Sequence, residues 1–377
     1  MKVAIFGAGQ AGKYLYEEII SNSNNIQVVA FIDNFVEGIY KNCIIYKPRD
    51  FFHNYIDIDA IFIAAGAQKT LRTMINLCRK NSIDEIYMLH DIAGKCHLQL
   101  FEDGKMNTFR IRKLNFSKEK PSLHYFEVPI TDNCNLNCKG CLFASNTTKT
   151  EQHIPYEILE VDAKRMSELF YDIPWIRILG GEPLMHPNIS RILKCYRTTF
   201  PNSEIDLCTN GLLIPKMDKV FWDCVKENRI SIHVSGYKPT FDMLDRIDTI
   251  LAKHELPYVI LKRNEFLKYY TDIPNNDMNE NFEKCIASGC YELYRGRIAS
   301  CSATIAFQKF NEIFKTEYQV LNNVDYVDIH NSNLSAWEIK EKLESASEIC
   351  KYCNVSKMES FEWDYSRQIS LDDYLIG

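Results

Sequence analysis

Three closely spaced cysteines constrain this chain more than any other feature of its sequence. Cys134, Cys138 and Cys141 lie in the stretch ITDNCNLNCKGCLFAS, residues 130–145, separated by three and then two residues. Thiolates this close on a tight loop can ligate three irons of a [4Fe–4S] cube and leave the fourth iron without a protein ligand. Zinc knuckles usually pair two C-x2-C units or add nearby histidines, and the nearest histidine downstream is His153. The spacing therefore favours an iron–sulfur loop over a structural zinc site or three buried thiols.

Short motifs follow the cysteine loop, each at the end of an expected strand. Strands and helices alternate from His124 to Lys262, a pattern that predicts a parallel sheet. In such sheets the active groups lie at the C-terminal ends of the strands. Three strands, WIRILGGEP, EIDLCTNG and RISIHVSGY, end in the candidate cofactor-binding residues Gly180, Gly181, Glu182, Pro183, Thr209, Asn210 and Ser235.

The cysteine loop, GGEP and TNG together resemble the radical S-adenosylmethionine (SAM) family. The resemblance implies a partial, six-stranded (β/α) barrel over residues 122–270. It also implies that SAM binds the open iron and is cleaved to methionine and a 5′-deoxyadenosyl radical. The two glycines would approach the amino group of SAM, Glu182 would orient the cofactor, and Ser235 would face its ribose or carboxylate. Thr209 and Asn210 would form another cofactor-side turn.

One position departs from the family pattern. The family usually has an aromatic residue just before the third cysteine, and this chain has Gly140. The contact with the adenine of SAM is therefore expected from a neighbour such as Leu142 or Phe143.

The first 95 residues predict a Rossmann-like domain. KVAIF reads as a buried strand, GAGQAG follows it, and a helix and the strand IQVVAFID come next. Gly7, Gly9 and Gly12 fit G-x-G-x-x-G, which lets the backbone approach a diphosphate at the helix N-terminus, and Asp33 is placed to bind a ribose. The stretch resembles the small nucleotide- or nucleotide-sugar-binding domains of bacterial polysaccharide enzymes. It lacks the Tyr-x-x-x-Lys of sugar epimerases, so a binding platform is expected, with a domain that only docks as the alternative.

Residues 96–121 are expected to form a linker or accessory hairpin, turning at residues 102–104. Residues 280–360 show no strong periodicity, which indicates irregular structure held by metal. Within them CYELYRGRIASC predicts a hairpin turning at Gly296. The region resembles the SPASM or twitch extension of radical SAM enzymes, which implies a second, auxiliary [4Fe–4S] cluster. Its favoured ligands are Cys285, Cys301, Cys350 and Cys353, with Cys290 in reserve; zinc suits four thiolates equally well.

Composition argues against several other classes of protein. The net charge of −6 comes without a basic tract, which argues against nucleic-acid or anionic-membrane partners. No apolar run approaches the ~20 residues of a membrane-spanning helix, and the N-terminus has no signal-peptide layout. The chain is expected to be soluble and cytoplasmic, where its 14 cysteines indicate metal binding rather than disulfides.

These patterns predict an α/β protein: a Rossmann-like doubly wound sheet, a partial radical SAM barrel and a small cysteine-rich C-terminal region. The expected function is a dehydrogenase-like radical SAM oxidoreductase. It would oxidise or remodel a small molecule, namely a sugar or nucleotide-linked sugar of polysaccharide or secondary-metabolite biosynthesis, with flavodoxin or ferredoxin as electron donor. Two alternatives stay open. A peptide or protein maturase would be expected to carry a winged-helix unit near its N-terminus, and a non-catalytic iron–sulfur or nucleotide sensor would have no need for a SAM site.

Overall fold

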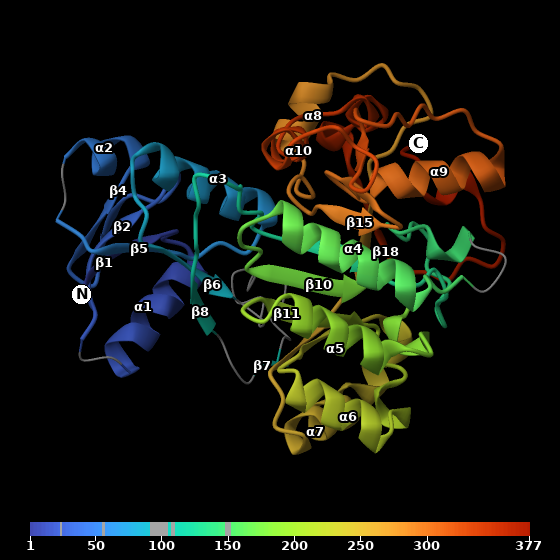
Figure 1. Cartoon of the computed structure of the whole chain (residues 1–377), viewed down its shortest axis with the longest axis horizontal. Coiled ribbons are helices and arrows are strands. Elements are labelled where there is room, and N and C mark those ends of the chain that lie inside the picture. Colours follow the sequence, from blue (N-terminus) through green and yellow to red (C-terminus); the bar gives the residue numbers. More distant parts are fainter. Residues whose placement is uncertain (23–24, 55–56, 91–104, 107–109, 148–151) are drawn as a thin grey trace. The chain divides into compact units, whose positions relative to one another are not determined.

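The computed structural model describes residues 1–22, 25–54, 57–90, 105–106, 110–147 and 152–377. The chain divides into two compact units, Met1–Phe116 and Ser117–Gly377 (Figure 1). The turn expected at residues 102–104 lies outside the described residues. Among the helices that are described, none combines the length and the apolar character needed to cross a membrane.

The first unit is built on a sheet with the strand order β3-β4-β2-β1-β5-β6-β8. Strands β4, β2, β1, β5 and β6 run parallel, and β3 and β8 pair antiparallel at the two edges. The strand bounds are β1 Lys2–Phe6, β2 Gln27–Ile32, β3 Gly38–Tyr40, β4 Cys43–Tyr46, β5 Ala60–Ile63, β6 Ile86–His90 and β8 Arg110–Lys113. The two-residue strand β7, Lys105–Met106, is not part of this sheet. The helices are α1 Gln10–Asn22, α2 Pro48–His53 and α3 Gln68–Lys80.

The apolar runs explain the centre of this sheet. Strands β1 and β5 are buried almost throughout, as central parallel strands covered on both faces are. Helix α1 packs Ala11, Leu15 and Ile19 against Val3 and Ile5 of β1. The edge strand β8 comes from the segment that was expected to be a linker or accessory hairpin, and it pairs with β6 of the first unit.

The second unit contains a sheet with the order β17-β16-β15-β9-β10-β11-β12-β13. Strands β9 to β13 run parallel and alternate with helices, as the sequence predicted. Their bounds are β9 Phe126–Pro129, α4 Tyr156–Leu169, β10 Trp175–Leu179, α5 Ile189–Thr199, β11 Glu204–Thr209, α6 Lys219–Glu227, β12 Ser231–Gly236, α7 Leu244–Lys253 and β13 Tyr258–Lys262. The next strand, β14 (Glu265–Lys268), pairs with β18 (Glu359–Glu362) in a separate ribbon. A six-stranded barrel stays a prediction.

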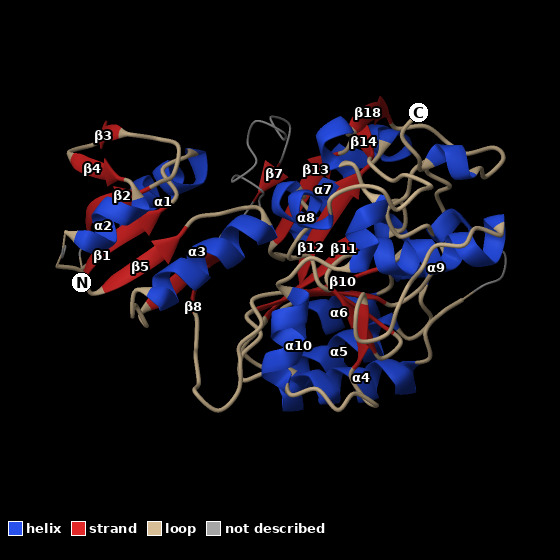
Figure 2. Cartoon of the chain, turned by 90° about the horizontal axis from the view of Figure 1, so that it is seen from above, coloured by secondary structure: helices blue, strands red, loops and turns tan. Residues whose placement is uncertain are grey.

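One face of this sheet is apolar and covered by helices. Figure 2 shows α4, α5 and α6 along one side of β10, β11 and β12. Ile176 and Ile178 of β10 share a buried core with residues of α4 to α7. Because side chains alternate along a strand, Arg177 between them points to the opposite face.

The hairpin around Gly296 is confirmed, because β15 (Glu292–Tyr294) and β16 (Arg297–Ala299) pair antiparallel on either side of it. The irregular structure expected for residues 280–360 is wrong in part. This region contains α8 Met278–Lys284, α9 Ala303–Phe314, β17 Tyr326–Asp328 and α10 Ala336–Leu343. Ala303, Ala306, Phe307 and Phe310 of α9 are buried and have the i, i+3, i+4, i+7 spacing of an amphipathic helix, a periodicity that the sequence interpretation missed. This helix packs Phe307 and Phe310 against Tyr270, Tyr318 and Tyr374.

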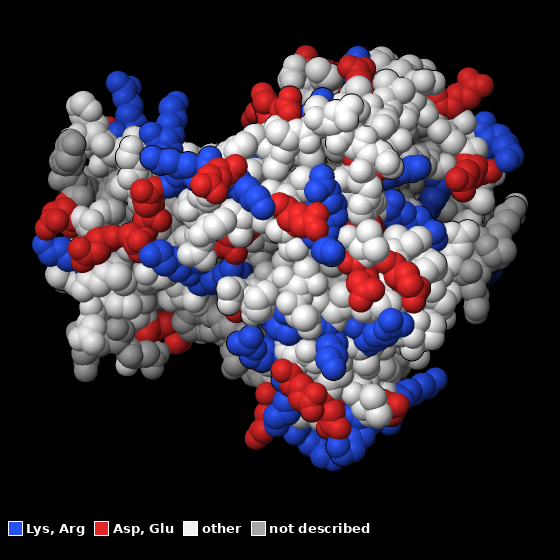
Figure 3. All heavy atoms as spheres, viewed as in Figure 1, with Lys and Arg blue, Asp and Glu red and all other residues white. Residues whose placement is uncertain are grey.

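The molecular surface carries charges of both signs. Figure 3 shows Lys and Arg interspersed with Asp and Glu over the visible face of the molecule. This mixture accords with the small net charge of −6.

Candidate active site

The cysteine loop follows β9 and brings its three thiols into one another's electrostatic field. Cys138 is buried, and Cys134 and Cys141 are half-buried. Burial raises the pKa of the Cys138 thiol to about 12, and the nearby Cys141 adds to the rise. Burial raises the pKa of Cys134 as well, with smaller contributions from Cys141 and Cys138. The thiols of Cys134 and Cys138 therefore need nearby positive charge to become thiolates, and iron would supply it when bound.

The two glycines of GGEP lie directly against the start of this loop. The backbone N–H of Gly181 donates to the Thr131 carbonyl at 2.7 Å, and that of Glu182 donates to the Asn133 carbonyl at 2.7 Å. Gly180 has a φ of +143°, and a Cβ at either glycine would overlap this backbone. The structure thus gives the glycines a contact with the cysteine loop, in addition to the contact with SAM that the family resemblance implies.

Glu182 ties the ends of β10 and β11 together. It is fully buried, and its Oε1 accepts from the Leu184 N–H at 3.0 Å and the Thr209 hydroxyl at 2.7 Å. Its Oε2 accepts from the Asn210 N–H at 2.8 Å. Burial raises the pKa of this carboxyl to about 7, and the hydrogen bonds work in the opposite direction. With three protein donors on it, Glu182 orders the two loops.

We expect Glu182→Gln to lower the free energy of unfolding by about 1–3 kcal/mol, because the amide replaces an acceptor with an NH2 group that faces a buried donor. Urea denaturation measures the change. Glu312→Gln at an exposed position of α9 is the control. A Glu182→Gln variant as stable as this control would contradict the assigned role.

The remaining motif residues lie at the same edge of the sheet. The Asn210 side-chain amide donates to Asn135 Oδ1 in the cysteine loop at 2.6 Å, and the Asn210 carbonyl accepts from the Thr240 hydroxyl at 2.9 Å. Pro183 begins a buried 3-10 turn, and Ser235 is half-buried near the end of β12. The strand ends therefore converge on the cysteine loop, as their order in the sequence predicted.

A buried ion pair behind the loop was not predicted. Lys309 of α9 contacts Asp132 Oδ1 at 2.6 Å and donates to the Phe143 carbonyl at 2.8 Å. The Tyr294 hydroxyl of the β15–β16 hairpin donates to Asp132 Oδ2 at 2.7 Å. Asp132 is 3% exposed. These bonds join the cysteine loop to the C-terminal region across 177 residues of sequence, a separation over which no local pattern could have revealed them.

Gly140 makes room for an aromatic side chain from the end of the chain. Its φ is +62°, and a Cβ there would lie 2.8 Å from Cζ of Phe361 in β18. The Phe361 ring packs on Phe266 at 6.0 Å between centroids, and Phe266 packs on Tyr237 at 5.5 Å. An aromatic row thus lies beside the position where the family usually has its own aromatic residue.

A row of polar side chains crosses the other face of the sheet. Strand register aligns, from β15 to β12, Glu292, Glu127, Arg177, Asp206 and Ser231. Arg177 lies 3.9 Å from Glu127 and 3.5 Å from Asp206. Both carboxylate oxygens of Glu292 are buried without a hydrogen-bond partner among the described residues. The alternation of WIRIL could have revealed Arg177 from the sequence, but its partners come from other strands.

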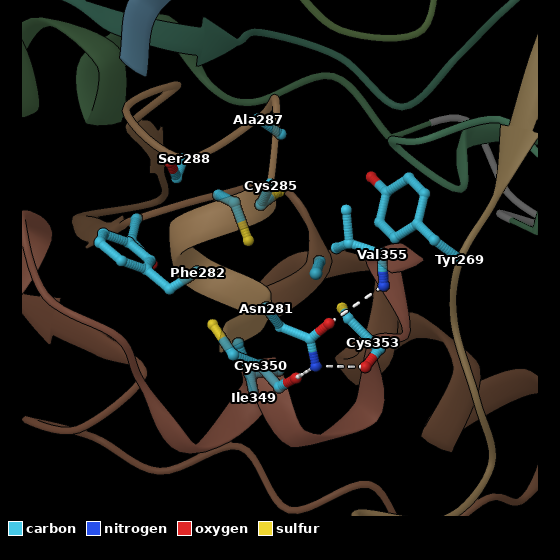
Figure 4. A pocket seen from close by; sticks show the side chains of 13 residues that line it. Tyr269, Asn281, Phe282, Cys285, Ala287, Ser288, Ile349, Cys350, Cys353 and Val355 are labelled. Atoms are coloured by element: carbon cyan, nitrogen blue, oxygen red, sulfur yellow. Dashed lines mark hydrogen bonds between the residues drawn. The ribbon is translucent and has the colours of Figure 1, made fainter. Parts of the chain in front are cut away.

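Four cysteines of the C-terminal region line one pocket. They are Cys285, Cys301, Cys350 and Cys353, the favoured set. Figure 4 labels Cys285, Cys350 and Cys353 among them. The side-chain amide of Asn281, which the sequence did not single out, donates to the Cys350 and Cys353 carbonyls at 3.1 and 2.5 Å. Cys290 is not among the pocket residues; it lies near Glu127 and Arg177, with Cys285 also nearby. The donor set fits a group with four thiolate ligands.

Among the residues that the structure describes, no three His, Cys, Asp or Glu side chains form a group that could hold a single metal ion.

In the first unit, Asp33, the residue predicted to bind a ribose, binds the chain's own backbone. Asp33 Oδ2 accepts from the Ala8 N–H in the glycine loop at 2.7 Å, and its Oδ1 accepts from Phe35 and Val36 at 2.7 and 2.9 Å. A Cβ on Gly7 would lie 2.5 Å from the Ala64 carbonyl oxygen, and one on Gly12 would overlap the Gly7 carbonyl. At Gly9 the same position faces open space. Of the three glycines, Gly9 leaves room for a ligand.

Comparison with known proteins places the family resemblance in the second unit. Residues 128–255 match the model of the Radical SAM superfamily. The GTP 3′,8-cyclase of Alkaliphilus metalliredigens is 29% identical over 147 residues, which are 39% of this chain and 44% of that protein. The GTP 3′,8-cyclase of Desulforamulus reducens is 33% identical over 132 residues, 33% of this chain and 39% of that protein. The chain thus spans less than half the length of these two curated relatives.

A solved structure covers a longer part of the chain. The crystal structure of BtrN in complex with AdoMet and 2-DOIA matches 62% of this chain and 94% of its own, with 13% identity and a TM-score of 0.37.

Proposed function

We propose that this chain, which contains a radical SAM superfamily domain, is an enzyme that oxidises or remodels a sugar or nucleotide-linked sugar. The observation that carries the proposal is the presence of two separate sets of cysteines. Three lie on a loop at the strand ends, and four line one pocket. The three-thiol loop fits a [4Fe–4S] cluster with an open iron for SAM, and the four-thiol pocket fits a fully ligated auxiliary cluster. When bound, the first cluster and SAM supply a 5′-deoxyadenosyl radical.

The chain's own residues would then position the reactants. Gly180, Gly181 and the turn at Asn210 form the edge of the sheet where SAM would lie. The aromatic row that ends in Phe361 offers the adenine contact that had been expected from Leu142 or Phe143. The polar row beneath offers carboxylates and a guanidinium to the hydroxyl or amino groups of a substrate. A fully ligated second cluster would suit a two-electron oxidation, because it could accept the electron that remains on the substrate.

The nucleotide part of the proposal rests on the first unit. Its strand order changes direction between β1 and β5, and the glycine loop follows β1. Ligands of open parallel sheets bind at such a switch point, at the carboxyl ends of the strands. Gly9 leaves open space there, whereas Asp33 already holds the loop. We therefore propose that this Rossmann-like unit holds a nucleotide or nucleotide-sugar, with Gly9 closest to it.

The substrate class is tested by turnover. Anaerobically reconstituted protein is incubated with SAM and dithionite, and 5′-deoxyadenosine is counted with and without sugar nucleotides, GTP or a mixture of peptides. We expect sugar nucleotides to stimulate its formation and to be oxidised. Stimulation by GTP would assign instead the substrate class named for the cyclase relatives, and stimulation by peptides would favour a maturase. Formation that no sugar changes would count against the proposal.

The auxiliary site is tested by two matched cysteine variants. We expect Cys301→Ser to lose the iron of one cluster, about four atoms per chain. Cys290→Ser should keep the full wild-type complement, since Cys290 lies outside the pocket. Iron and zinc counts per chain are the measurement. Zinc that is found in place of iron and lost in Cys301→Ser would make the pocket a zinc site, and iron loss in Cys290→Ser would overturn the ligand set.

A further inference from the structure

The residues just after β18 pair with the cysteine loop. The Lys139 N–H donates to the Asp364 carbonyl at 3.0 Å, and the Ser366 N–H donates to the Asn137 carbonyl at 2.7 Å. Between these two bonds, Cys138 and Tyr365 form an antiparallel bridge. The ammonium group of Lys139 and the carboxylate of Asp364 also form an ion pair at 2.8 Å. Residues 363–366 therefore run beside the loop as a short added strand centred on Cys138.

This pairing brings an indole to the sulfur of Cys138. Trp363 Nε1–H donates to Cys138 Sγ at 3.0 Å. The backbone of Trp363 is held separately, because its N–H donates to the Asn264 carbonyl at 2.7 Å. Strand β18, which precedes it, is fixed by its pairing with β14. An indole nitrogen has one hydrogen and no acceptor function, so this bond has a single direction.

We propose that Trp363 is a positioning residue that raises the reduction potential of the cluster ligated by Cys138. This inference rests on the proposed function. A donor at a ligating sulfur withdraws negative charge from it, and this favours the reduced, more negative state of the cluster. The bond also fixes the rotamer of Cys138 from the side of residues 363–366. The chain thus uses a side chain 225 residues away to set the redox property of its cysteine loop.

Removing the N–H alone tests this role. Trp363→Phe keeps an aromatic ring and deletes the donor; Trp337→Phe, on the half-exposed Trp337 of α10, is the control. Both are reconstituted with iron and sulfide, iron is counted, and the midpoint potential is followed by electron paramagnetic resonance. The signal that changes on adding SAM identifies the cluster with the open iron. We expect Trp363→Phe to bind wild-type iron and to show a more negative midpoint, with no shift in Trp337→Phe.

A second replacement separates the hydrogen bond from the packing of the ring. Substituting 3-benzothienylalanine at position 363 keeps the bicyclic shape and replaces the N–H with sulfur. If Trp363→Phe loses iron, the midpoint potential of the cluster is measured in the benzothienyl protein instead. A value more negative than that of the wild type supports the proposal. An unchanged midpoint with full iron overturns it. So does loss of the cluster in both variants, because Trp363 would then hold the loop rather than tune it. Wild-type protein that takes up no iron would instead refute the proposed function itself.

Discussion

The Cys134/Cys138/Cys141→Ala variant is expected to bind about four irons per chain where the wild type binds about eight, and to lose all SAM cleavage. The three thiols lie together at the strand ends, whereas the other four line a separate pocket. Removing the first set should therefore leave the second cluster in place. Iron counting after anaerobic reconstitution and chromatography for 5′-deoxyadenosine give the two readouts.

Cys195, Cys208 and Cys224 provide the control, since all three lie outside both thiol groups. Their simultaneous replacement by Ala should keep iron and cleavage unchanged if the protein folds, which circular dichroism verifies. Retention of cleavage in the Cys134/Cys138/Cys141 variant would refute the assignment of the loop. A well-folded wild type with neither iron nor cleavage would refute the radical mechanism as a whole.

Lys309→Met is expected to lower the free energy of unfolding by about 3–5 kcal/mol, because it leaves the buried carboxylate of Asp132 without its cation. Lys309 also holds the Phe143 carbonyl, so the cysteine loop should lose order together with stability. Urea denaturation measures the first effect, and iron retention after gel filtration measures the second.

The double variant Asp132→Asn/Lys309→Met separates the pair from its surroundings. With both charges removed, much of the lost stability should return, since the large penalty belongs to the unpaired carboxylate. Lys315→Met, at the exposed end of α9, is the matched single change and should cost little. A loss in Lys309→Met no larger than in Lys315→Met would contradict the importance of this ion pair.

The contacts that could be predicted from the sequence are those between residues of recognisable motifs. GGEP, TNG and the three cysteines lie at strand ends, and parallel strands that alternate with helices bring such ends to one edge. Cys285, Cys301 and the C-x2-C unit came from a family pattern, and the structure gathers them around one pocket. Asp33 shows that one sequence pattern can have two structural explanations. Its side chain accepts hydrogen bonds from the Phe35 and Val36 N–H groups, as Asp commonly does in a local turn. This role competes with the ribose binding that the glycine motif predicted.

The contacts that could not be predicted join distant segments through ordinary groups. Lys309 is a buried charge on the packed side of α9, and only the fold brings it to Asp132. Residues 363–366 bind the cysteine loop largely through backbone N–H and carbonyl groups, which every residue carries, so no side-chain pattern marks them. The Phe361 ring takes up space that a side chain at position 140 would occupy. A glycine in the sequence does not indicate which distant residue packs against it.

The bonds between the cysteine loop and residues 364–366 also determine when the site can be completed during biosynthesis. Asn137 and Ser366, which bond to each other, are 229 residues apart. At synthesis rates of about 5–20 residues per second, the ribosome needs roughly 10–50 s to travel between them. During that interval the three thiols emerge without Trp363, Phe361 or the added strand beside them. Iron delivered to the nascent chain would meet an unfinished loop, so the complete site forms only after translation has passed Ser366.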